Sequence, residues 1–238
     1  MGKVISWEHV MKGALTMPGV KVDRNSFLQS CFSAYGKSDE LKDKRPSDIY
    51  SQKVIDKVAR GIVNNHTTKV SLISTVVGIP GGLAMLGSLP ADMAQYYWHF
   101  FVMAQKLAYV YGWPDLRDEN NNLGEQAQAI LTIFIGIGFG VDGASTAVRA
   151  IAKKAAEHWA KKLPRMALTK TVWYPIAKKV AGWLGIKLTK ESAGKAVSKF
   201  IPILGGIISG SLTLATFKPM ANKLRANLSE CQRIALEG

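Results

Sequence analysis

The chain has 238 residues and a formal net charge of +14 at pH 7, so it can bury a substantial core and favours anionic partners, either phospholipid headgroups or nucleic acid. Its mean hydropathy of +0.05, with 20% charged residues, excludes a protein that spans a membrane many times. Cys31 and Cys231 have no metal-ligand spacing, and residues 1–20 hold no continuous apolar core of a secretory signal, which predicts a reduced, cytosolic chain.

The first part of the chain is typical of soluble amphipathic helices. Apolar residues recur at helical spacing, Asp23 is expected to cap a second helix, and Ser47 is expected to cap a third. The charged stretch 37–45 is expected to be a solvated connector between them. Residues 1–65 are therefore predicted to form N-terminal helices that pack on a helical domain formed by residues 66–238.

A central stretch follows in which the character of the sequence changes. Residues 70–91 are uncharged and rich in glycine and proline, so a broken or hairpin path is expected rather than one straight helix. A long central helix is predicted at 93–111, because Pro90 and Asp92 suit its first turn and Gly112 supplies its stop.

Two further runs, 126–141 and 200–217, are also uncharged. The first is predicted to lie in a helix capped by Asn122, and the second to form another glycine-rich hairpin before a terminal helix that begins at Met220. Whether the three uncharged runs contact lipid or one another is left open. The predicted fold is all-α, a single compact domain of about eight or nine helices in which two glycine-rich hairpins pack around the central helix.

Each uncharged run holds one Gly-x-x-x-Gly pair, a spacing at which two helix backbones can approach closely. The pairs are Gly78 with Gly82, Gly136 with Gly140, and Gly206 with Gly210. Such pairs suit lipid-embedded helices or, alternatively, dense packing in a water-soluble core. Residues 138–143 also satisfy G-x-G-x-x-G, but no strand is expected before them, so no nucleotide site is predicted.

The positive charge is concentrated in one segment. Residues 149–199 contain 13 Lys or Arg against two acids, which accounts for +11 of the net +14. Trp159, Trp173, Tyr174 and Trp183 are interleaved with these lysines, as at a bilayer interface; the alternative is a solvated basic face with the tryptophans in the core. The candidate contacts to anionic lipid are Arg149, Lys153, Lys154, Lys161, Lys162, Arg165, Lys170, Lys178 and Lys179.

A polar stripe is predicted on one face of the central helix, formed by Asp92, Gln95, Tyr96, His99 and Lys106. Asp92 and His99 are either a proton-active or ligand-binding pair, or a helix cap and a histidine bonded to a neighbouring backbone. The four histidines are scattered without metal-ligand spacing, and there is no nucleophile elbow or phosphate-binding loop. No catalytic residue, metal or cofactor is predicted.

Residues 78–113, GIPGGLAMLGSLPADMAQYYWHFFVMAQKLAYVYGW, combine a glycine-rich turn, a Pro-Ala-Asp helix start and a long helix that ends in Tyr-Gly. They resemble the EcsC-like family of bacterial proteins, and the Ile-Pro-glycine pattern at 201–210 with Phe-Lys-Pro-Met-Ala at 217–221 resembles the closing segment of that family. The resemblance implies a helical, membrane-associated accessory protein, like the founding member encoded beside an ABC transporter, without an established catalytic mechanism. The matching motif residues are Pro80, Gly81, Gly82, Pro90, Asp92, Tyr111, Gly112, Pro202, Gly205, Gly206 and Gly210.

The expected function is that of a non-enzymatic cytoplasmic protein, peripheral to or partly inserted in the inner face of a membrane, that docks on anionic lipid through the basic segment. A membrane protein or a second copy of the chain is a further possible partner. The alternatives are an effector that inserts into and permeabilises bilayers in defence or competition, a nucleic-acid-binding protein, and a lipid or small-molecule carrier or enzyme with a pocket at Asp92 and His99.

Overall fold

The computed structural model describes residues 6–73, 91–157, 170–192 and 210–237. Within these ranges the chain forms nine α-helices and no strand, which confirms the predicted all-α fold of a single compact domain. The helices are α1 (Trp7–Thr16), α2 (Arg24–Phe32), α3 (Pro46–Ile49), α4 (Gln52–Ile73), α5 (Ala91–Val110), α6 (Glu125–Phe139), α7 (Ala144–Glu157), α8 (Lys170–Ser192) and α9 (Gly210–Glu237), with short 3-10 helices η1 (Ser33–Tyr35) and η2 (Ser38–Lys42) after α2.

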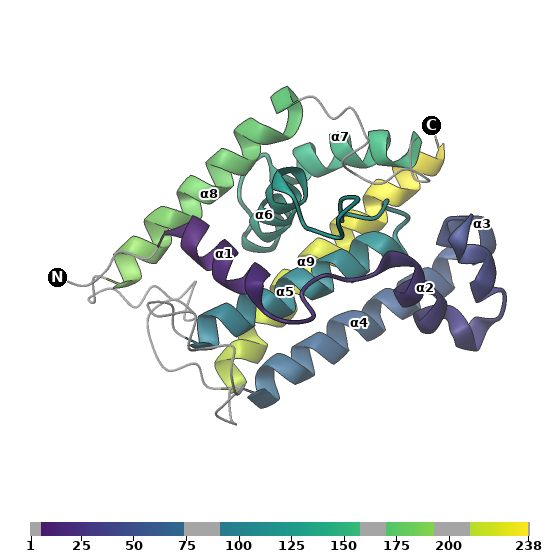
Figure 1. Ribbon diagram of the computed structural model, residues 1–238, viewed down its shortest axis with the longest axis horizontal. Helices are drawn as coiled ribbons and strands as arrows, with labels where there is room; N and C mark the ends of the chain where they lie inside the picture. The colour runs from purple at the N-terminus through teal and green to yellow at the C-terminus, as the bar shows by residue number, and fades with distance from the viewer. Residues whose placement is uncertain (1–5, 74–90, 158–169, 193–209, 238) are drawn as a thin grey trace.

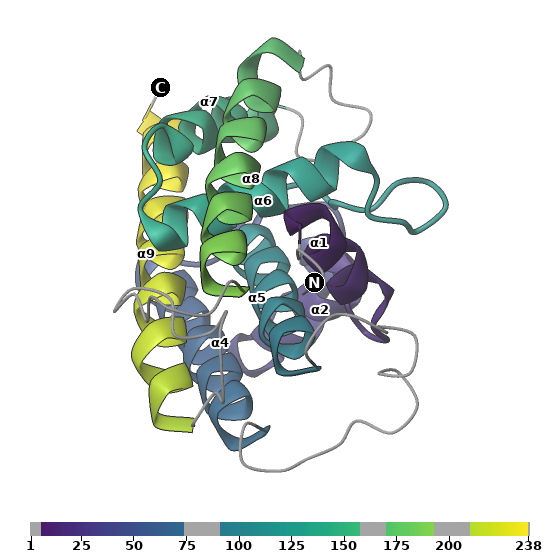
Figure 2. The same ribbon diagram turned by 90° about the vertical axis from the view of Figure 1, so that its left-hand side faces the viewer.

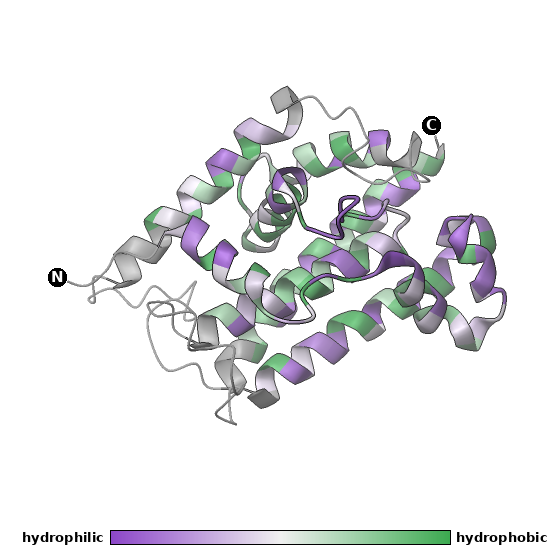
Figure 3. Cartoon of the chain, viewed as in Figure 1, coloured by the Kyte–Doolittle hydropathy of each residue, from purple (hydrophilic) through white to green (hydrophobic). Residues whose placement is uncertain are grey.

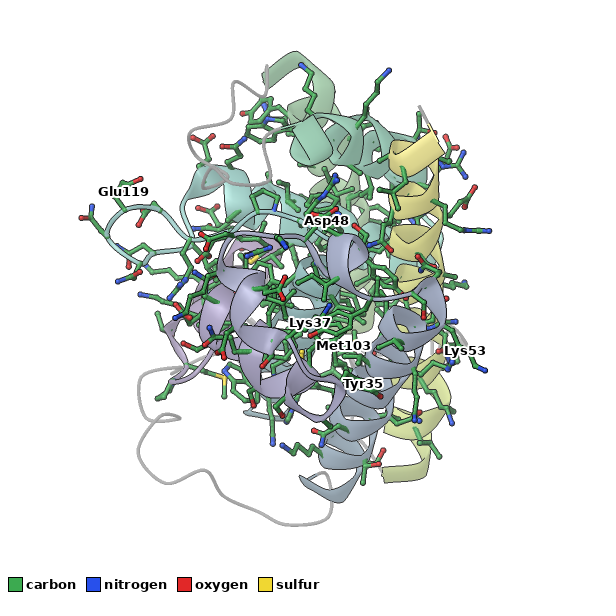
Figure 4. The ribbon with its side chains drawn as sticks, turned by 90° about the vertical axis from the view of Figure 1, so that its right-hand side faces the viewer. Tyr35, Lys37, Asp48, Lys53, Met103 and Glu119 are labelled. Atoms are coloured by element: carbon green, nitrogen blue, oxygen red, sulfur yellow. The ribbon has the colours of Figure 1, made fainter. Side chains whose placement is uncertain are left out.

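Helix α5 is the centre of the molecule, as predicted for the long central helix. It contacts α1, α2, α4, α6 and α9, and Figures 1 and 2 show these helices surrounding it. Phe100, Met103 and Leu107 are fully buried on α5, and Met103 lies deep in the molecule in Figure 4. The helix ends as the sequence predicts: Gly112 has φ +85°, and Trp113 N donates to the Ala108 carbonyl across the cap.

The loop between α1 and α2 is fixed to α5 by the side chain of Gln105. Its Nε2 donates to the Val20 carbonyl at 2.7 Å, and its Oε1 accepts from Val22 N at 3.2 Å. All three residues are buried, so the amide of Gln105 satisfies backbone groups that no helix pairs. Asp23 caps α2 by accepting from Ser26 N, which confirms its predicted role.

The segment before α4 differs from the sequence prediction. Ser47 does not cap one long helix; Arg45 precedes α3, and Asp48 accepts from Arg45 N. Tyr50 is extended between α3 and α4, its ring stacked on Phe32 with centroids 4.6 Å apart, and these contacts separate the two helices. The connector at 37–45 is not fully solvated either, because η2 forms within it and buries Leu41 completely.

Helix α6 carries the uncharged run 126–141, and protein covers it. Every residue from 130 to 138 is buried, and α6 packs against α5, α7, α8 and α9. A Cβ at Gly136 would lie 2.7 Å from Val180 Cγ2, so glycine permits the close approach of α8. Gly140 has φ +72° and ends the helix. In this Gly-x-x-x-Gly pair, the first glycine therefore permits a close helix contact and the second caps α6. Gly124 stands at the N-cap, and the predicted Asn122 cap is wrong.

Helix α9 also departs from the prediction, because it is continuous from Gly210 to Glu237 instead of beginning at Met220. Pro219 lies inside it. Proline has no backbone N–H, so Pro219 cannot donate to the Ala215 carbonyl as a helical residue normally would. Both residues are exposed, so water can hydrogen-bond to that carbonyl. Most of the two expected glycine-rich hairpins lies outside the described residues.

The helices that border residues 74–90 and 193–209 end on one side of the molecule. The C-terminal end of α4 and the N-terminal ends of α5 and α9 lie in the lower part of the molecule in Figures 1 and 2, and the C-terminal end of α8 is directed toward them from above. We call this side the helix-end face. Hydrophilic and hydrophobic residues alternate along α4 and α7 (Figure 3), as expected of amphipathic helices. No described helix has the length and apolar composition needed to cross a bilayer.

Candidate functional site

The predicted polar stripe of α5 divides between two neighbouring helices. Tyr96 is buried and its hydroxyl donates to Met220 Sδ at 3.2 Å, toward α9. His99 and Lys106 lie toward α4 instead. Gln95 is half-buried, and its Nε2 has no partner among the described residues. Asp92 lies in the first turn of α5, where only the backbone is described, so its predicted pairing with His99 stays a prediction.

Two histidines meet in the core between α4 and α5. His66 Nδ1 lies 3.4 Å from His99 Nδ1, with the rings at 75°, and the two residues are only 4% and 3% exposed. The sequence prediction missed this pair. His99 Nδ1 meets a second imidazole, and the expectation that His99 bonds a neighbouring backbone stays a prediction for its other ring nitrogen. No spacing signal marks the pair, since 33 positions separate its members.

Lys106 fixes the hydrogen positions in this pair. Its Nζ lies 3.3 Å from His66 Nε2, and an ammonium can only donate, so that nitrogen accepts. A neutral His66 then carries its hydrogen on Nδ1 and donates it to His99 Nδ1. His99 in turn carries its hydrogen on Nε2. The result is a directed chain of hydrogen bonds from Lys106 through His66 to His99.

Burial and neighbouring cations keep both imidazoles neutral. Burial, then the ammonium of Lys106, then His99 and Lys69, lower the pKa of His66 to about 3. Burial, then Lys69 and Lys106, lower the pKa of His99 to about 4. Burial and Lys69 also lower the pKa of Lys106, while Cys31 on α2 acts in the opposite direction. No described carboxylate contributes to any of these shifts. The described residues hold no group of three or more His, Cys, Asp or Glu that could bind a metal.

The predicted basic segment is partly neutralised. Arg149 pairs with Glu230 at 2.7 Å and Lys179 with Asp142 at 2.9 Å, both at exposed positions. Lys153 is exposed and Lys154 half-buried on α7. Lys161, Lys162 and Arg165 lie outside the described residues, and Lys170 begins α8 without a described side chain.

The aromatic residues of α8 do not all face solvent. Trp173 is 3% exposed, and Trp183 packs on Phe139 with ring centroids 5.5 Å apart. For Trp173 the alternative of a tryptophan in the core is therefore correct. Tyr174 is the exposed aromatic residue, and Lys178 Nζ lies 4.7 Å above its ring.

One line of residues on α8 faces outward and is defined here as the α8 outer stripe. It consists of Tyr174, Lys178, Gly182 and Ile186, at four-residue spacing, all of them exposed. Tyr174 is 37% and Ile186 59% exposed. The sequence contains no Asp or Glu from 158 to 190. The stripe is thus apolar at both ends and basic between them.

A small pocket lies far from the histidines, where the C-terminal ends of α5 and α9 approach α3 and α7. Its lining includes Arg45, Trp113, Gln232 and Leu236, and its enclosed volume is about 20 Å³, enough for a water molecule. Gln232 is 6% exposed, and neither amide atom has a partner among the described residues. This is not the position predicted for a ligand pocket beside His99.

The predicted motif residues fall into two groups. Tyr111 donates its hydroxyl to the Asp56 carboxylate at 2.9 Å, and Gly112 closes α5, so both have structural roles at the α4–α5 contact. Gly210 begins α9. Asp92 lies in the first turn of α5, and the remaining seven, Pro80, Gly81, Gly82, Pro90, Pro202, Gly205 and Gly206, lie outside the described residues.

No family model matches the chain, and comparison with curated proteins and with solved structures finds no significant match. The resemblance to the EcsC-like family stays a prediction.

Proposed function

We propose that the protein is a non-enzymatic accessory protein that docks peripherally on an anionic bilayer through the helix-end face and the α8 outer stripe. The observation that carries the proposal is the stripe itself. Ile186 exposes more than half of its surface about two turns from Lys178 on the same line of α8, and the sequence holds no Asp or Glu from 158 to 190. An apolar side chain next to cations suits the boundary between lipid headgroups and acyl chains.

The arrangement of helices supports one common face for docking. In Figure 2, α8 lies in front, and its C-terminal end is directed toward the lower part of the molecule, where α4, α5 and α9 border 74–90 and 193–209. Leu214, in the second turn of α9, is 46% exposed near this face. Sequence adds to this, since the uncharged runs 70–91 and 200–217 both connect to helix ends on this side. Most of the third run lies in α6, where residues 130–138 are buried in protein.

The expected energies are modest and salt-dependent. A lysine near an anionic surface contributes about 1 kcal/mol, and insertion of an isoleucine side chain about 1.5–3 kcal/mol. Lys178 and Ile186 together therefore contribute about 3 kcal/mol, which is a factor of about 150 in affinity.

Flotation with vesicles of phosphatidylglycerol or phosphatidylcholine, at low and high salt, tests the proposal. We expect binding to phosphatidylglycerol at low salt, and a loss of about 30-fold or more in the double variant Lys178→Glu, Ile186→Glu. The matched control is Lys53→Glu, Ile234→Glu, which changes an exposed lysine and an exposed isoleucine away from the helix-end face; Figure 4 shows Lys53 pointing into solvent.

Equal flotation with neutral and anionic vesicles, or equal losses in the two double variants, would refute docking by this face. Release of a trapped dye by the wild type would favour the permeabilising effector instead. Tight, salt-dependent binding to duplex DNA without binding to lipid would favour the nucleic-acid alternative.

A further inference from the structure

A cluster of cationic and donor groups lies between α4 and α5, and no carboxylate of the described residues pairs with it. We call His66, Lys69, His99 and Lys106 the His–Lys cluster. Lys69 is exposed, Lys106 is half-buried and both imidazoles are buried, so the cluster extends from solvent into the core; the charge of Lys69 acts on the other three groups. No salt bridge reaches either lysine among the described residues.

The hydrogen-bonding capacity of the cluster is unbalanced. Its two acceptors, His66 Nε2 and His99 Nδ1, are already used within the chain that begins at Lys106. What remains are donors: the three N–H groups of Lys69, the other N–H groups of Lys106, and Nε2–H of His99. Cys31 of α2 does not compete for them, because its thiol donates to the Leu28 carbonyl at 3.5 Å. The ligand that matches these donors is a negatively charged group with only hydrogen-bond acceptors.

The described groups around Lys106 also favour a bound anion. Lys106 Nζ lies 5.5 Å from the centroid of the Phe27 ring, which is a weak partner for a half-buried ammonium. A metal ion fits less well, although a nitrogen separation of 3.4 Å would suit shared ligation. No third ligand is present among the described residues, and two ammonium groups would repel a dication.

We propose that the His–Lys cluster is an oxyanion site that takes a phosphate group, with Lys69 and Lys106 on two sides and the imidazole of His99 behind. Phosphate presents acceptor oxygens on several sides at once, which suits donors supplied by two helices, Lys69 from α4 and Lys106 and His99 from α5. Lys69 lies one turn before Ile73, where α4 reaches the helix-end face. The phosphate can therefore come from a lipid headgroup or from solution.

Imidazole resonances of the wild-type protein give the first test, in phosphate-free buffer titrated with inorganic phosphate. We expect the signals of His66 and His99 to move saturably and their titration midpoints to rise, because a bound anion favours the protonated ring. His9, exposed on α1, is the internal control and should not follow them. Zinc chloride is added in a separate titration.

Variants then test the lysines, with folding checked by the thermal midpoint. Lys69→Gln and Lys106→Gln should each weaken phosphate affinity at least about 10-fold, while Lys53→Gln, at the far end of α4, should leave it unchanged. If Lys106→Gln also reduces flotation on phosphatidylglycerol, the source is lipid; if flotation is unaffected, the source is soluble phosphate. A failure of docking therefore does not remove this site.

Three results would overturn the site. The first is the absence of any response of His66 and His99 to phosphate or to phosphatidylglycerol. The second is an equal loss of phosphate affinity in Lys53→Gln. The third is saturable zinc binding that moves both histidines where phosphate does not.

Discussion

Acidification should destabilise the protein through the buried histidine pair. The pKa of His66 is lowered from 6.5 to about 3 and that of His99 from 6.5 to about 4, mainly by burial. Between pH 6.5 and these values the unfolded chain binds protons that the folded chain does not. The stabilisation is therefore fully present above pH 6.5 and is lost as the pH falls toward 4.

The magnitude follows from the two pairs of pKa values. At pH 5 an unfolded histidine is almost fully protonated, whereas both folded imidazoles remain largely neutral. Each histidine should then lower the free energy of unfolding by about 2 kcal/mol relative to pH 7.5, and the pair by about 4 kcal/mol. A loss of this size is a large part of the stability of an ordinary domain.

Urea unfolding at pH 7.5 and pH 5.0, in phosphate-free buffer, measures the effect. His66→Gln should reduce the difference between the two pH values by about half, whatever its absolute stability, because one of the two groups no longer titrates. His9→Gln, at an exposed position on α1, is the matched control and should leave the difference unchanged. A wild-type difference below about 1 kcal/mol, or the same difference in both variants, would show that the pair does not resist protonation as described.

Four further substitutions test the packing. Gly136→Ala should destabilise the protein by about 1–3 kcal/mol in chemical denaturation, because Val180 must move. Gly61→Ala, whose Cβ would meet nothing within 4 Å, should instead stabilise it by up to about 1 kcal/mol. Similar values for both variants would contradict the close contact of α6 and α8. Gln105→Leu should cost about 2–4 kcal/mol, since two buried backbone groups lose their partners, and a change below about 1 kcal/mol would show that water replaces the amide. Pro219→Ala should raise the thermal midpoint of unfolding, because it restores a helix hydrogen bond, and a lower midpoint would argue that the proline is required for the path of α9.

The sequence predicted helix ends well where the capping or terminating residue acts on backbone groups close to it in the chain. Asp23 and Gly112 act as expected, because each needs only backbone groups within one turn. The errors arose where distant contacts decide. Tyr50 interrupts an apparently continuous helix by stacking on Phe32, and Pro219 is tolerated inside α9 because its position is exposed.

The candidate site was predicted only in part for the same reason. His99 and Lys106 were identified as polar residues on an apolar helix, but their partners His66 and Lys69 come from α4. The periodicity of one helix contains no information about which neighbour it meets. The inward position of Trp173 likewise depends on how α8 rotates against α6, which composition cannot specify.

The position of α6 has a consequence for biosynthesis. In this helix nine consecutive residues, 130–138, are buried, yet three of the helices that pack on it, α7, α8 and α9, are translated after it. A ribosome therefore releases a strongly apolar segment well before the helices that shield it. Until α9 emerges, the nascent polypeptide must keep α6 from aggregating, so this protein is expected to rely on chaperones during synthesis and to acquire its native core only near the end of translation.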